Sequence, residues 1–561
     1  MTDPQPTRPA AGAGPLRVAF LGGLGEIGRN CAVIEYAGAR LLIDCGLAFP
    51  NDDQPGVDII LPDWSWLAAE PERVVGVVIT HAHEDHMGAL PYFLRDFDVP
   101  VYSTRLSLGM LAAKLEEHQI TPRTVTVEAG QRYAAGPFEL EFFAVTHSIP
   151  DGVAVAVRTP AGSLVHTGDF KIDLTPIDGR ATDLGGLARL SGEGVDLLLS
   201  DSTNAEVPGF VPTEAGVGQT LRDLFSKAER RIVVACFASH IHRMQQIFDA
   251  SAAVGRKVAL VGRSIVRNVG VASDLGYLRL PPDLLIPVEE LVGMPPEQTV
   301  VLSTGSQGEP YSALSLMASR DHRWVRIEPG DTVVLSSSLI PGNEAPVFRT
   351  INSLAREGAE VYHRGNAAVH VSGHAAQGEL LLLLSTLRPR NMVPVHGEYR
   401  HLARHARLAV AAGVAPDNVF ICEDGDVIEL EGGVARRGEP VPVGMVFVDG
   451  VGVGDVGAAV LRDRRKLGED GFVHIMATVD FQTGKVLAGP DIVTRGFVYE
   501  PESEDLIAEA RARIVAALEK LAGEGVSDLS IMKQRMRQAA ARLFDERTQR
   551  RPVIIPTVME V

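Results

Sequence analysis

Short apolar runs separated by polar turns recur through the first part of the chain, a pattern typical of buried and half-buried β-strands. The runs lie at residues 18–21, 40–44, 74–80, 139–145, 163–167 and 196–200. Several of these predicted strands are followed closely by His or Asp. Polar groups at strand ends are how α/β folds build sites on a rigid sheet. We therefore expect this part of the chain to carry the chemistry.

From about Pro212 the pattern changes to helices alternating with strands, which predicts a parallel sheet with its own core. The predicted helices lie at 221–228 and 242–250, and the strands at 231–236, 257–261, 299–303 and 332–336. Histidine-rich sequence returns near His370, and a buried strand follows at 391–395. The middle unit, 212–368, is therefore predicted to be an insert that divides the first domain into 15–211 and 369–440.

The pattern changes again after residue 440. A Gly-rich stretch predicts a linker over 441–457, followed by a small α/β domain over 458–561. In this last domain we expect strands at 472–480, 491–499 and 552–558, with helices at 504–522 and 532–545. Residues 1–14 are rich in Pro, Ala and Gly and lack a basic start followed by an apolar core. They predict a disordered tail and not a signal peptide.

Composition places the chain among soluble globular enzymes, with 561 residues of which 45% are hydrophobic and 22% charged. No apolar run is long enough to cross a membrane. The four cysteines, Cys31, Cys45, Cys236 and Cys422, are scattered, which argues against a disulfide framework and predicts a cytoplasmic protein. The net charge of −18 opposes nucleic-acid binding over the whole surface. Any positive potential must be confined to one cleft and to bound metal ions.

The segment from Thr80 to Gly88, Thr-His-Ala-His-Glu-Asp-His-Met-Gly, carries the strongest chemical signal. It places His81, His83, Asp85 and His86 directly after an apolar strand, where a turn can aim them at one point. Imidazole and carboxylate are ligands that suit Zn²⁺ or Mn²⁺. Such dense packing of histidines has no folding advantage, so the segment predicts a metal site.

Two metal ions need more ligands than one loop provides. His147, Asp169 and His396 each follow a different predicted strand. A carboxylate such as Asp169 can bridge two cations, which dinuclear hydrolases hold about 4 Å apart. Each residue alone is more often structural, but together they complete a plausible ligand set.

The order His81-x-His83-x-Asp85-His86, then His147, Asp169 and His396, resembles the metallo-β-lactamase superfamily. The resemblance implies an αββα sandwich with two divalent metal ions, Zn²⁺ or Mn²⁺, at one sheet edge. It implies that one ion is held by His81, His83, His147 and Asp169, and the other by Asp85, His86, Asp169 and His396. Asp44 matches the superfamily's first motif, and it is expected to support the metal ligands by hydrogen bonding.

The insert narrows the choice of substrate, which the superfamily alone leaves open. Ser200–Asn204, with Asp201 as a catalytic residue, stands where the β-CASP nuclease branch carries its acidic motif, and His370–Ala375 resembles that branch's later His motif. With residues 237–243, 396–400 and the C-terminal domain, the chain resembles the bacterial ribonuclease J family from about Pro15 onward. That resemblance implies a metal-dependent 5′-to-3′ exonuclease, also an endonuclease, acting on single-stranded RNA in RNA maturation and decay.

The resemblance also suggests roles for single residues. Asp85 is expected to orient the attacking water, and His370 is the candidate general acid, with a strut at the domain joint as the alternative. A pocket preferring a 5′ monophosphate is expected from Ser239, His240, His370, Ser372, Gly373 and His374. The alternative for Ser372 and His374 is a buried hydrogen-bonded pair. His240 stands where some relatives carry a small polar residue, which puts the pH dependence of that position in doubt. Basic residues that could line an RNA channel are Lys171, Arg243, Arg263 and Arg267.

Other functions remain open on the sequence. A DNA nuclease of the same fold would differ only in its contact to the 2′-hydroxyl group and in its partners. A small-molecule hydrolase is disfavoured because a domain-sized insert would cover its site needlessly. A silent scaffold would have lost metal ligands, and none is lost here. The predicted partners are single-stranded RNA, a second copy through the C-terminal domain and other RNA-decay proteins, with no membrane.

Overall fold

The structure is a computed structural model that describes residues 14–309, 311–340, 343–480, 482–498 and 503–561. The predicted disordered tail, residues 1–14, lies outside this range except for its last residue. The described chain forms two compact units. One comprises the residues up to Phe49 together with Ile60–Val446, and the other comprises Pro50–Ile59 together with the residues from Phe447 onward.

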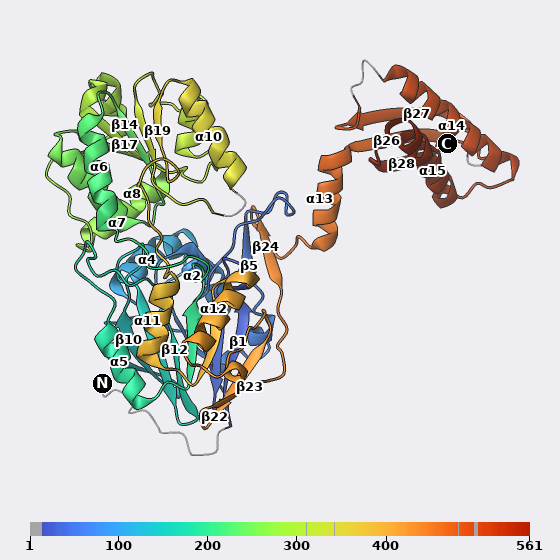
Figure 1. Ribbon diagram of the computed structural model, residues 1–561. Coiled ribbons are helices and arrows are strands. Elements are labelled where there is room, and N and C mark those ends of the chain that lie inside the picture. Colours follow the sequence, from blue (N-terminus) through green and yellow to red (C-terminus); the bar gives the residue numbers. More distant parts are fainter. Residues whose placement is uncertain (1–13, 310, 341–342, 481, 499–502) are drawn as a thin grey trace. The chain divides into compact units, whose positions relative to one another are not determined.

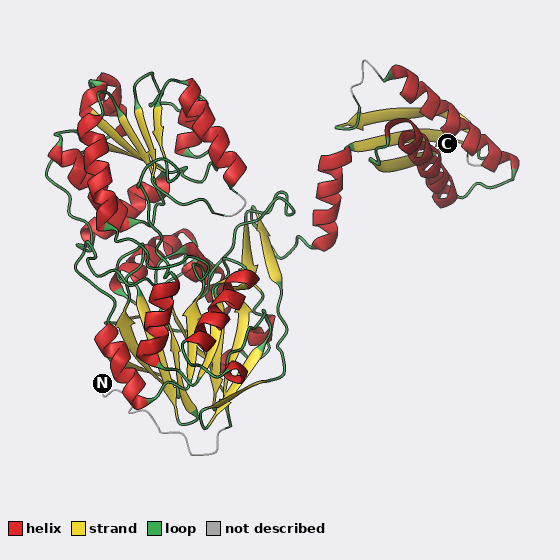
Figure 2. Ribbon diagram, viewed as in Figure 1, coloured by secondary structure: helices red, strands yellow, loops and turns green. Residues whose placement is uncertain are grey.

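Two β-sheets pack face to face in the first unit (Figure 2). The larger sheet runs β23-β22-β1-β3-β4-β6-β7-β8, and the smaller runs β20-β13-β12-β11-β10-β9. The larger contains β1 (Leu16–Gly22), β3 (Cys31–Tyr36), β4 (Ala39–Ile43), β6 (Val74–Val78), β7 (Val101–Ser103), β8 (Thr124–Thr126), β22 (Val427–Glu431) and β23 (Val434–Arg437). The smaller contains β9 (Arg132–Ala135), β10 (Phe138–Ala144), β11 (Val153–Thr159), β12 (Gly162–His166), β13 (Leu197–Asp201) and β20 (Asn391–Val395).

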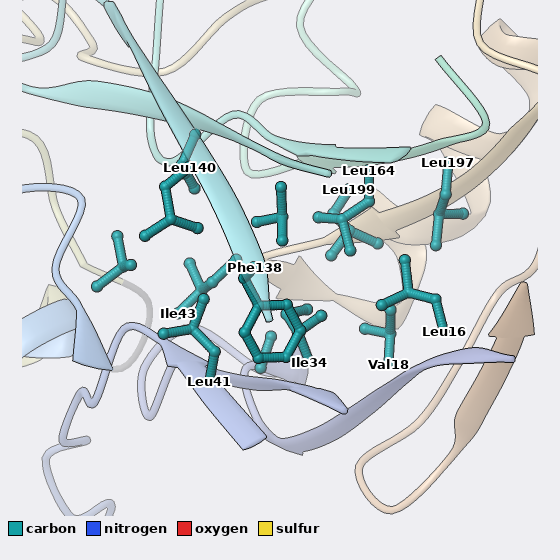
Figure 3. Packing of buried hydrophobic residues seen from close by; sticks show 14 of the residues in the cluster. Leu16, Val18, Ile34, Leu41, Ile43, Phe138, Leu140, Leu164, Leu197 and Leu199 are labelled. Carbon is teal, nitrogen blue, oxygen red and sulfur yellow. The ribbon is translucent and has the colours of Figure 1, made fainter. Parts of the chain in front are cut away.

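The core lies between these sheets because alternate residues of their strands point inward. Leu16, Ile34 and Leu41 from the larger sheet meet Phe138 and Leu164 from the smaller one (Figure 3). A second apolar layer packs the outer face of the smaller sheet against helices α5 (Leu184–Glu193), α11 (Gln377–Leu387) and α12 (Tyr399–Ala411). The predicted apolar runs of the first domain are therefore confirmed as strands, each within a few residues.

The insert forms a third sheet in which every neighbouring pair is parallel, in the order β16-β15-β17-β14-β18-β19. Its strands are β14 (Ile232–Ala235), β15 (Lys257–Val261), β16 (Leu285–Ile286), β17 (Thr299–Ser303), β18 (Thr332–Leu335) and β19 (Glu360–Tyr362). Its helices include α6 (Ala215–Lys227), α7 (Ile241–Ala253), α8 (Arg263–Asp274), α9 (Ala313–Ala318) and α10 (Glu344–Arg356), and Figure 1 shows them around the sheet. The predicted parallel sheet is confirmed, while α8, α9 and α10 were not predicted.

A buried guanidinium group joins the two connections between the insert and the first domain. Arg243 of α7 is fully buried and binds both carboxylate oxygens of Glu214, at 2.7 and 3.0 Å. Glu214 lies just before α6, where the chain enters the insert. Arg243 also donates to the carbonyl oxygen of Val369, at 2.7 Å, where the chain leaves the insert.

The prediction that Arg243 and Lys171 line an RNA channel is therefore wrong. Arg243 is buried in this ion pair, and Lys171 is buried beside Asp173, with its Nζ 3.3 Å from a carboxylate oxygen. Long basic side chains look alike in a sequence whether they face solvent or a buried carboxylate, so their positions required the tertiary structure. Arg263 is exposed, and Arg267 pairs with Glu117 at 3.2 Å.

The second unit has a mixed sheet, ordered β27-β26-β28, built from β26 (Phe472–Val479), β27 (Val486–Arg495) and β28 (Val553–Glu560). Helices α14 (Glu504–Gly523) and α15 (Leu529–Thr548) supply the rest of its core. The predicted linker contains an antiparallel pair, β24 (Met445–Asp449) and β25 (Gly452–Val453), so part of it is regular structure. Helix α13 (Ala458–Asp470) follows. The end of the predicted strand 491–499 falls outside the described residues.

None of the described helices is both long and apolar enough to cross a bilayer.

Candidate active site

One edge of the paired sheets collects the polar residues that follow the strands. Asp44 follows β4, His81 follows β6, His147 follows β10, Asp169 follows β12, and His396 follows β20. Strands β12, β13 and β20 are parallel to one another, as are β4 and β6. The carboxyl ends of parallel strands lie at the same edge of a sheet, which brings residues far apart in sequence to one place.

Asp44 fastens the histidine-rich loop to the larger sheet. It accepts hydrogen bonds from the backbone N–H of Thr80, at 2.8 Å, and from the hydroxyl group of Thr80, at 2.9 Å. Its other contact is to His86 Nδ1, at 2.7 Å. Gly46 lets the loop pass close by, since a Cβ atom there would lie 1.6 Å from the carbonyl oxygen of Asp85. Asp44 therefore orients His86 and leaves its Nε2 atom facing the site.

Two groups of potential metal ligands share one carboxylate. His81, His83, His147 and Asp169 form the first, and Asp85, His86, Asp169 and His396 form the second. Within each group the ligand atoms lie within 4.8 Å of one another. Asp169 Oδ2 lies 3.2 Å from His86 Nε2 and 3.7 Å from the Nε2 atoms of His81 and His147. Asp169 Oδ1 is buried without a hydrogen-bond partner among the described residues. Imidazole and carboxylate groups are ligands that suit divalent cations, and Asp169 belongs to both donor sets.

The first group is prepared to bind a cation without losing protons. Burial lowers the pKa of His81 and of His147 well below the ordinary value, and it lowers the pKa of His83 to about 4. Neutral imidazole is the form that ligates metals.

The second group is more basic. Burial lowers the pKa of His86 and His396, but nearby carboxylates outweigh it. Asp169, Asp44 and Asp85 raise the pKa of His86 well above normal, while Asp169, Asp201 and Asp85 raise that of His396 to about 10. A cation bound there must displace these protons.

A third group adjoins the second and was not predicted from the sequence. His374 Nδ1 lies 2.9 Å from Asp201 Oδ2, and His396 Nδ1 lies 3.5 Å from Asp201 Oδ1. Asp169, Asp201, His374 and His396 together satisfy the same distance condition as the other groups. Burial lowers the pKa of His374, but Asp201 and Asp169 outweigh it and raise the pKa above normal. His374 was expected only as a phosphate-binding residue, and the structure also joins it to Asp201.

His370 and His240 form a separate buried pair whose rings lie 6.2 Å apart. Burial, together with the charge of Arg243, lowers the pKa of both well below normal. A group that is neutral at pH 7 is a poor general acid, so this environment opposes the role predicted for His370. His240 Nδ1 accepts a hydrogen bond from the backbone N–H of Arg243, at 3.3 Å. His240 Nε2 and His370 Nδ1 are buried and have no hydrogen-bond partner among the described residues, although a carboxylate oxygen of Glu214 lies 3.9 Å from His240 Nε2.

The segment from Ser372 to His374 lies against the first ligand group. The carbonyl oxygen of Gly373 accepts a hydrogen bond from His147 Nδ1, at 2.8 Å. A Cβ atom at Gly373 would lie 2.7 Å from the His147 ring, so only glycine allows this approach. Ser239, the remaining residue of the predicted phosphate pocket, is half-buried just before α7.

Three polar residues at the site were not predicted from the sequence. Asn204 donates to Ser372 Oγ at 2.7 Å, and the hydroxyl group of Thr203 lies 2.5 Å from His396 Nδ1. Asn30 Nδ2 donates to the carbonyl oxygen of Asp85 at 3.0 Å. Thr203 and Asn204 lie two and three residues after Asp201, within the Ser200–Asn204 motif that the sequence analysis identified for Asp201 alone, whereas no local signal marks Asn30.

Comparison with known proteins supports this organisation over nearly the whole chain. The model "Metallo-beta-lactamase superfamily" matches residues 24–208, and "Ribonuclease J, beta-CASP domain" matches 229–354. "Zn-dependent metallo-hydrolase RNA specificity domain" matches 359–422, and "Ribonuclease J C-terminal domain" matches 459–561. The predicted fold class, a metallo-β-lactamase sandwich with a β-CASP insert and a C-terminal α/β domain, is confirmed.

Relatives that match this chain over nearly its full length are named Ribonuclease J or Ribonuclease J2. The protein called Ribonuclease J in Mycobacterium tuberculosis H37Rv is 47% identical over 550 residues, which cover 98% of each chain. Ribonuclease J of Corynebacterium glutamicum is 44% identical over 560 residues, 100% of this chain and 78% of that protein. Ribonuclease J2 of Bacillus subtilis is 40% identical, over 97% of this chain and 99% of that protein. A crystal structure from Enterococcus faecalis V583, of unknown function, shares the fold with a TM-score of 0.53 and 16% identity, covering 74% of this chain and 100% of that one.

Proposed function

This chain belongs to the ribonuclease J family, and we propose that it degrades single-stranded RNA as a 5′-to-3′ exonuclease that prefers a 5′ monophosphate and also cuts internally. Family membership makes it a metal-dependent ribonuclease. The observation that carries the mechanism is the pair of His and Asp groups sharing Asp169.

The residues of the two groups would hold two divalent ions, Zn²⁺ or Mn²⁺, with Asp169 between them. When bound, such ions polarise the phosphodiester and lower the pKa of water. Asp85 orients the attacking water from within the second group, where its carboxylate lies 3.1 Å from His396 Nε2. Asp44 keeps His86 in position.

A 5′ phosphate would be held beside these groups by donors that are already arranged. His240 accepts a backbone hydrogen bond at Nδ1, so its neutral ring carries a proton on Nε2, which has no hydrogen-bond partner among the described residues. The hydroxyl groups of Ser372 and Ser239 and the backbone N–H of Gly373 supply further donors, while the backbone N–H of His374 donates to Ser372 Oγ, at 3.2 Å. His370 contributes to this pocket as a neutral residue. A terminal phosphate bound here would set the register of exonuclease cleavage.

His374, in place of His370, is proposed as the group that protonates the leaving 3′ oxygen. Asp201 orients its ring through the 2.9 Å contact, the arrangement of a carboxylate supporting a histidine acid. His374→Ala should lower the cleavage rate of RNA by about 10²- to 10⁴-fold. Cleavage of RNA with sulfur at the leaving 3′ position should fall much less, because a thiolate leaves without a proton. Single-turnover rates on the two substrates measure this effect, and an equal loss on both would contradict the role.

The proposed function is tested by a time course on 5′-monophosphorylated single-stranded RNA, 5′-hydroxyl RNA and the matching DNA. Reactions contain Mn²⁺, Zn²⁺ or a chelator. We expect metal-dependent release of mononucleotides from RNA, fastest with the 5′ monophosphate. Ser372→Ala should reduce that preference without equal loss on 5′-hydroxyl RNA. Equal activity on DNA would indicate a DNA nuclease, and inactivity with metal bound would reject the ribonuclease assignment.

The C-terminal domain is proposed to join two copies of the chain. Its helices pack on one face of the sheet, and on the other face Val493, His474 and Ile555 stand side by side across three strands. Ile555 is 48% exposed, and Met559 of the same strand is 51% exposed. An apolar sheet face of this kind is typical of a protein interface.

Ile555→Asp should convert the proposed dimer to a monomer, measured by sedimentation velocity. If the unsubstituted chain sediments as a monomer, the dimer proposal is wrong, and the exposed sheet face would instead suit other RNA-decay proteins.

We also propose that the protein is located in the cytoplasm. All four cysteines are free and buried. Free thiols agree with a reducing cytoplasm, where RNA decay takes place.

A further inference from the structure

A pocket of about 370 Å³ opens in the β-CASP insert, beyond the carboxyl ends of β17, β18 and β19. Its described lining includes Ser306 after β17, Ser337 after β18, and Val347 and Phe348 of α10. None of the residues in the three ligand groups lines it. Open parallel sheets bind ligands in the crevice outside the carboxyl ends of their strands, so the location itself favours a ligand site.

The floor of the pocket is apolar and carries an aromatic ring that is open to solvent. Leu335 and Val347 are buried, while Phe348 is 47% exposed. The His363 ring stands edge-on to Phe348, with centroids 6.4 Å apart and an interplanar angle of 88°. The perpendicular contact with His363 restricts the Phe348 ring, which remains 47% exposed and can receive a flat ring. Single-stranded nucleic acids bind proteins by stacking bases on such side chains.

The charge of the pocket is opposite to that of the protein as a whole. No Asp or Glu is among the described residues that line it, although the chain carries a net charge of −18. Arg364 lines the pocket, is exposed, and makes no hydrogen bond or ion pair with any described residue. An unpaired guanidinium beside an aromatic ring suits a phosphodiester next to a base.

The pocket wall is preformed, and its residue Ser337 directly follows a serine that contacts the segment before His370. Gln307 donates to Ser337 Oγ, at 3.2 Å, and to the carbonyl oxygen of Ser338, at 2.8 Å. Ser336 Oγ donates to the carbonyl oxygen of Val369, at 2.7 Å, which precedes His370. The charge of Arg364 also contributes, after burial and Arg243, to the low pKa of His370.

We propose that this pocket is a separate RNA-binding subsite, where one nucleobase stacks on Phe348 and the adjoining phosphodiester pairs with Arg364. This inference rests on the proposed ribonuclease function and deepens it. A second anchor outside the metal groups holds a polymer during successive cleavages although the protein is acidic. It selects single strands, because a base must be unpaired and unstacked to lie on Phe348.

The test is equilibrium binding of a fluorescent 5′-monophosphorylated oligouridine, followed by anisotropy with chelator present so that no cleavage occurs. Phe348→Ala should weaken binding by on the order of tenfold, while Phe348→Trp should retain it. Arg364→Gln should reduce the slope of log Kd against log salt by about 0.7, the value for one phosphate contact on a single strand. Arg356→Gln, an exposed charge at the end of the same helix, is the matched control and should leave both quantities unchanged.

Cleavage assays separate failure of the subsite from failure of the function. With metal added, Phe348→Ala should raise the KM for the oligouridine and leave cleavage of a dinucleotide unchanged. If the unsubstituted chain cleaves RNA and Phe348→Ala binds it with unchanged affinity, the subsite is wrong and the ribonuclease assignment stands. If the unsubstituted chain neither binds nor cleaves RNA, both are wrong.

Discussion

Asp169→Asn is expected to remove both metal ions and to lower the rate of RNA cleavage by at least about a thousandfold. Asp169 is the only residue shared by all three ligand groups of the described chain. Its Oδ2 atom lies 3.2 to 3.8 Å from the ring nitrogens of five histidines, His81, His86, His147, His374 and His396. Asn preserves the shape of the side chain but removes the charge that balances two cations, so neither site keeps its affinity.

Metal content by mass spectrometry and single-turnover cleavage measure this effect. His81→Ala is the informative comparison because His81 belongs to the first ligand group alone. The His81→Ala protein should therefore lose one equivalent of bound metal and not two. Asp196→Asn is the control. Asp196 is half-buried and accepts a hydrogen bond from Ser163, at 3.0 Å, outside every ligand group. An Asp169→Asn protein that retains two metal equivalents would contradict the bridging role.

Arg243→Met should destabilise the unit containing the insert by about 3 to 5 kcal/mol, the usual cost of removing one partner of a buried ion pair. Glu214 is 5% exposed and would be left as a buried charge without its partner. The carbonyl oxygen of Val369 would also lose one of its two donors and keep only the hydroxyl group of Ser336. Because Val369 precedes His370, we expect weaker binding of the 5′ phosphate in addition to lower stability.

The first thermal unfolding transition, followed by calorimetry, measures the loss. Arg263→Met, an exposed position on α8 of the same insert, should change stability by less than about 0.5 kcal/mol. Adding Glu214→Leu to Arg243→Met should recover part of the loss, because it removes the unpaired charge. If Arg243→Met melts like the unsubstituted chain but binds RNA less well, Arg243 contacts RNA and is not structural.

Local patterns in the sequence were enough to predict most of the strands and the order of the domains. Strands with apolar alternation and helices with their longer period depend on neighbouring residues, so the strands of the first domain, the parallel sheet of the insert and the C-terminal α/β domain could be predicted. The packing of the first domain's strands into two sheets was implied by the resemblance to the metallo-β-lactamase superfamily. The ligand groups could also be predicted, because each member follows a strand and the resemblance to a known superfamily supplied the order. The structure brings those residues together as expected at one sheet edge.

The tertiary structure decided what depends on partners far away in sequence. His374 and Asp201 are separated by 173 positions, and Arg243 and Val369 by 126. No local period encodes such pairs, so the sequence alone placed Arg243 in a channel and chose His370 as the acid. Burial beside Arg243 keeps His370 neutral, and contact with a carboxylate makes His374 basic. The pocket between α10 and the ends of β18 and β19 likewise exists only once the insert is folded. The sequence by itself determined which groups are present and which strands they follow, whereas burial and charge in the folded chain decided the state of each group.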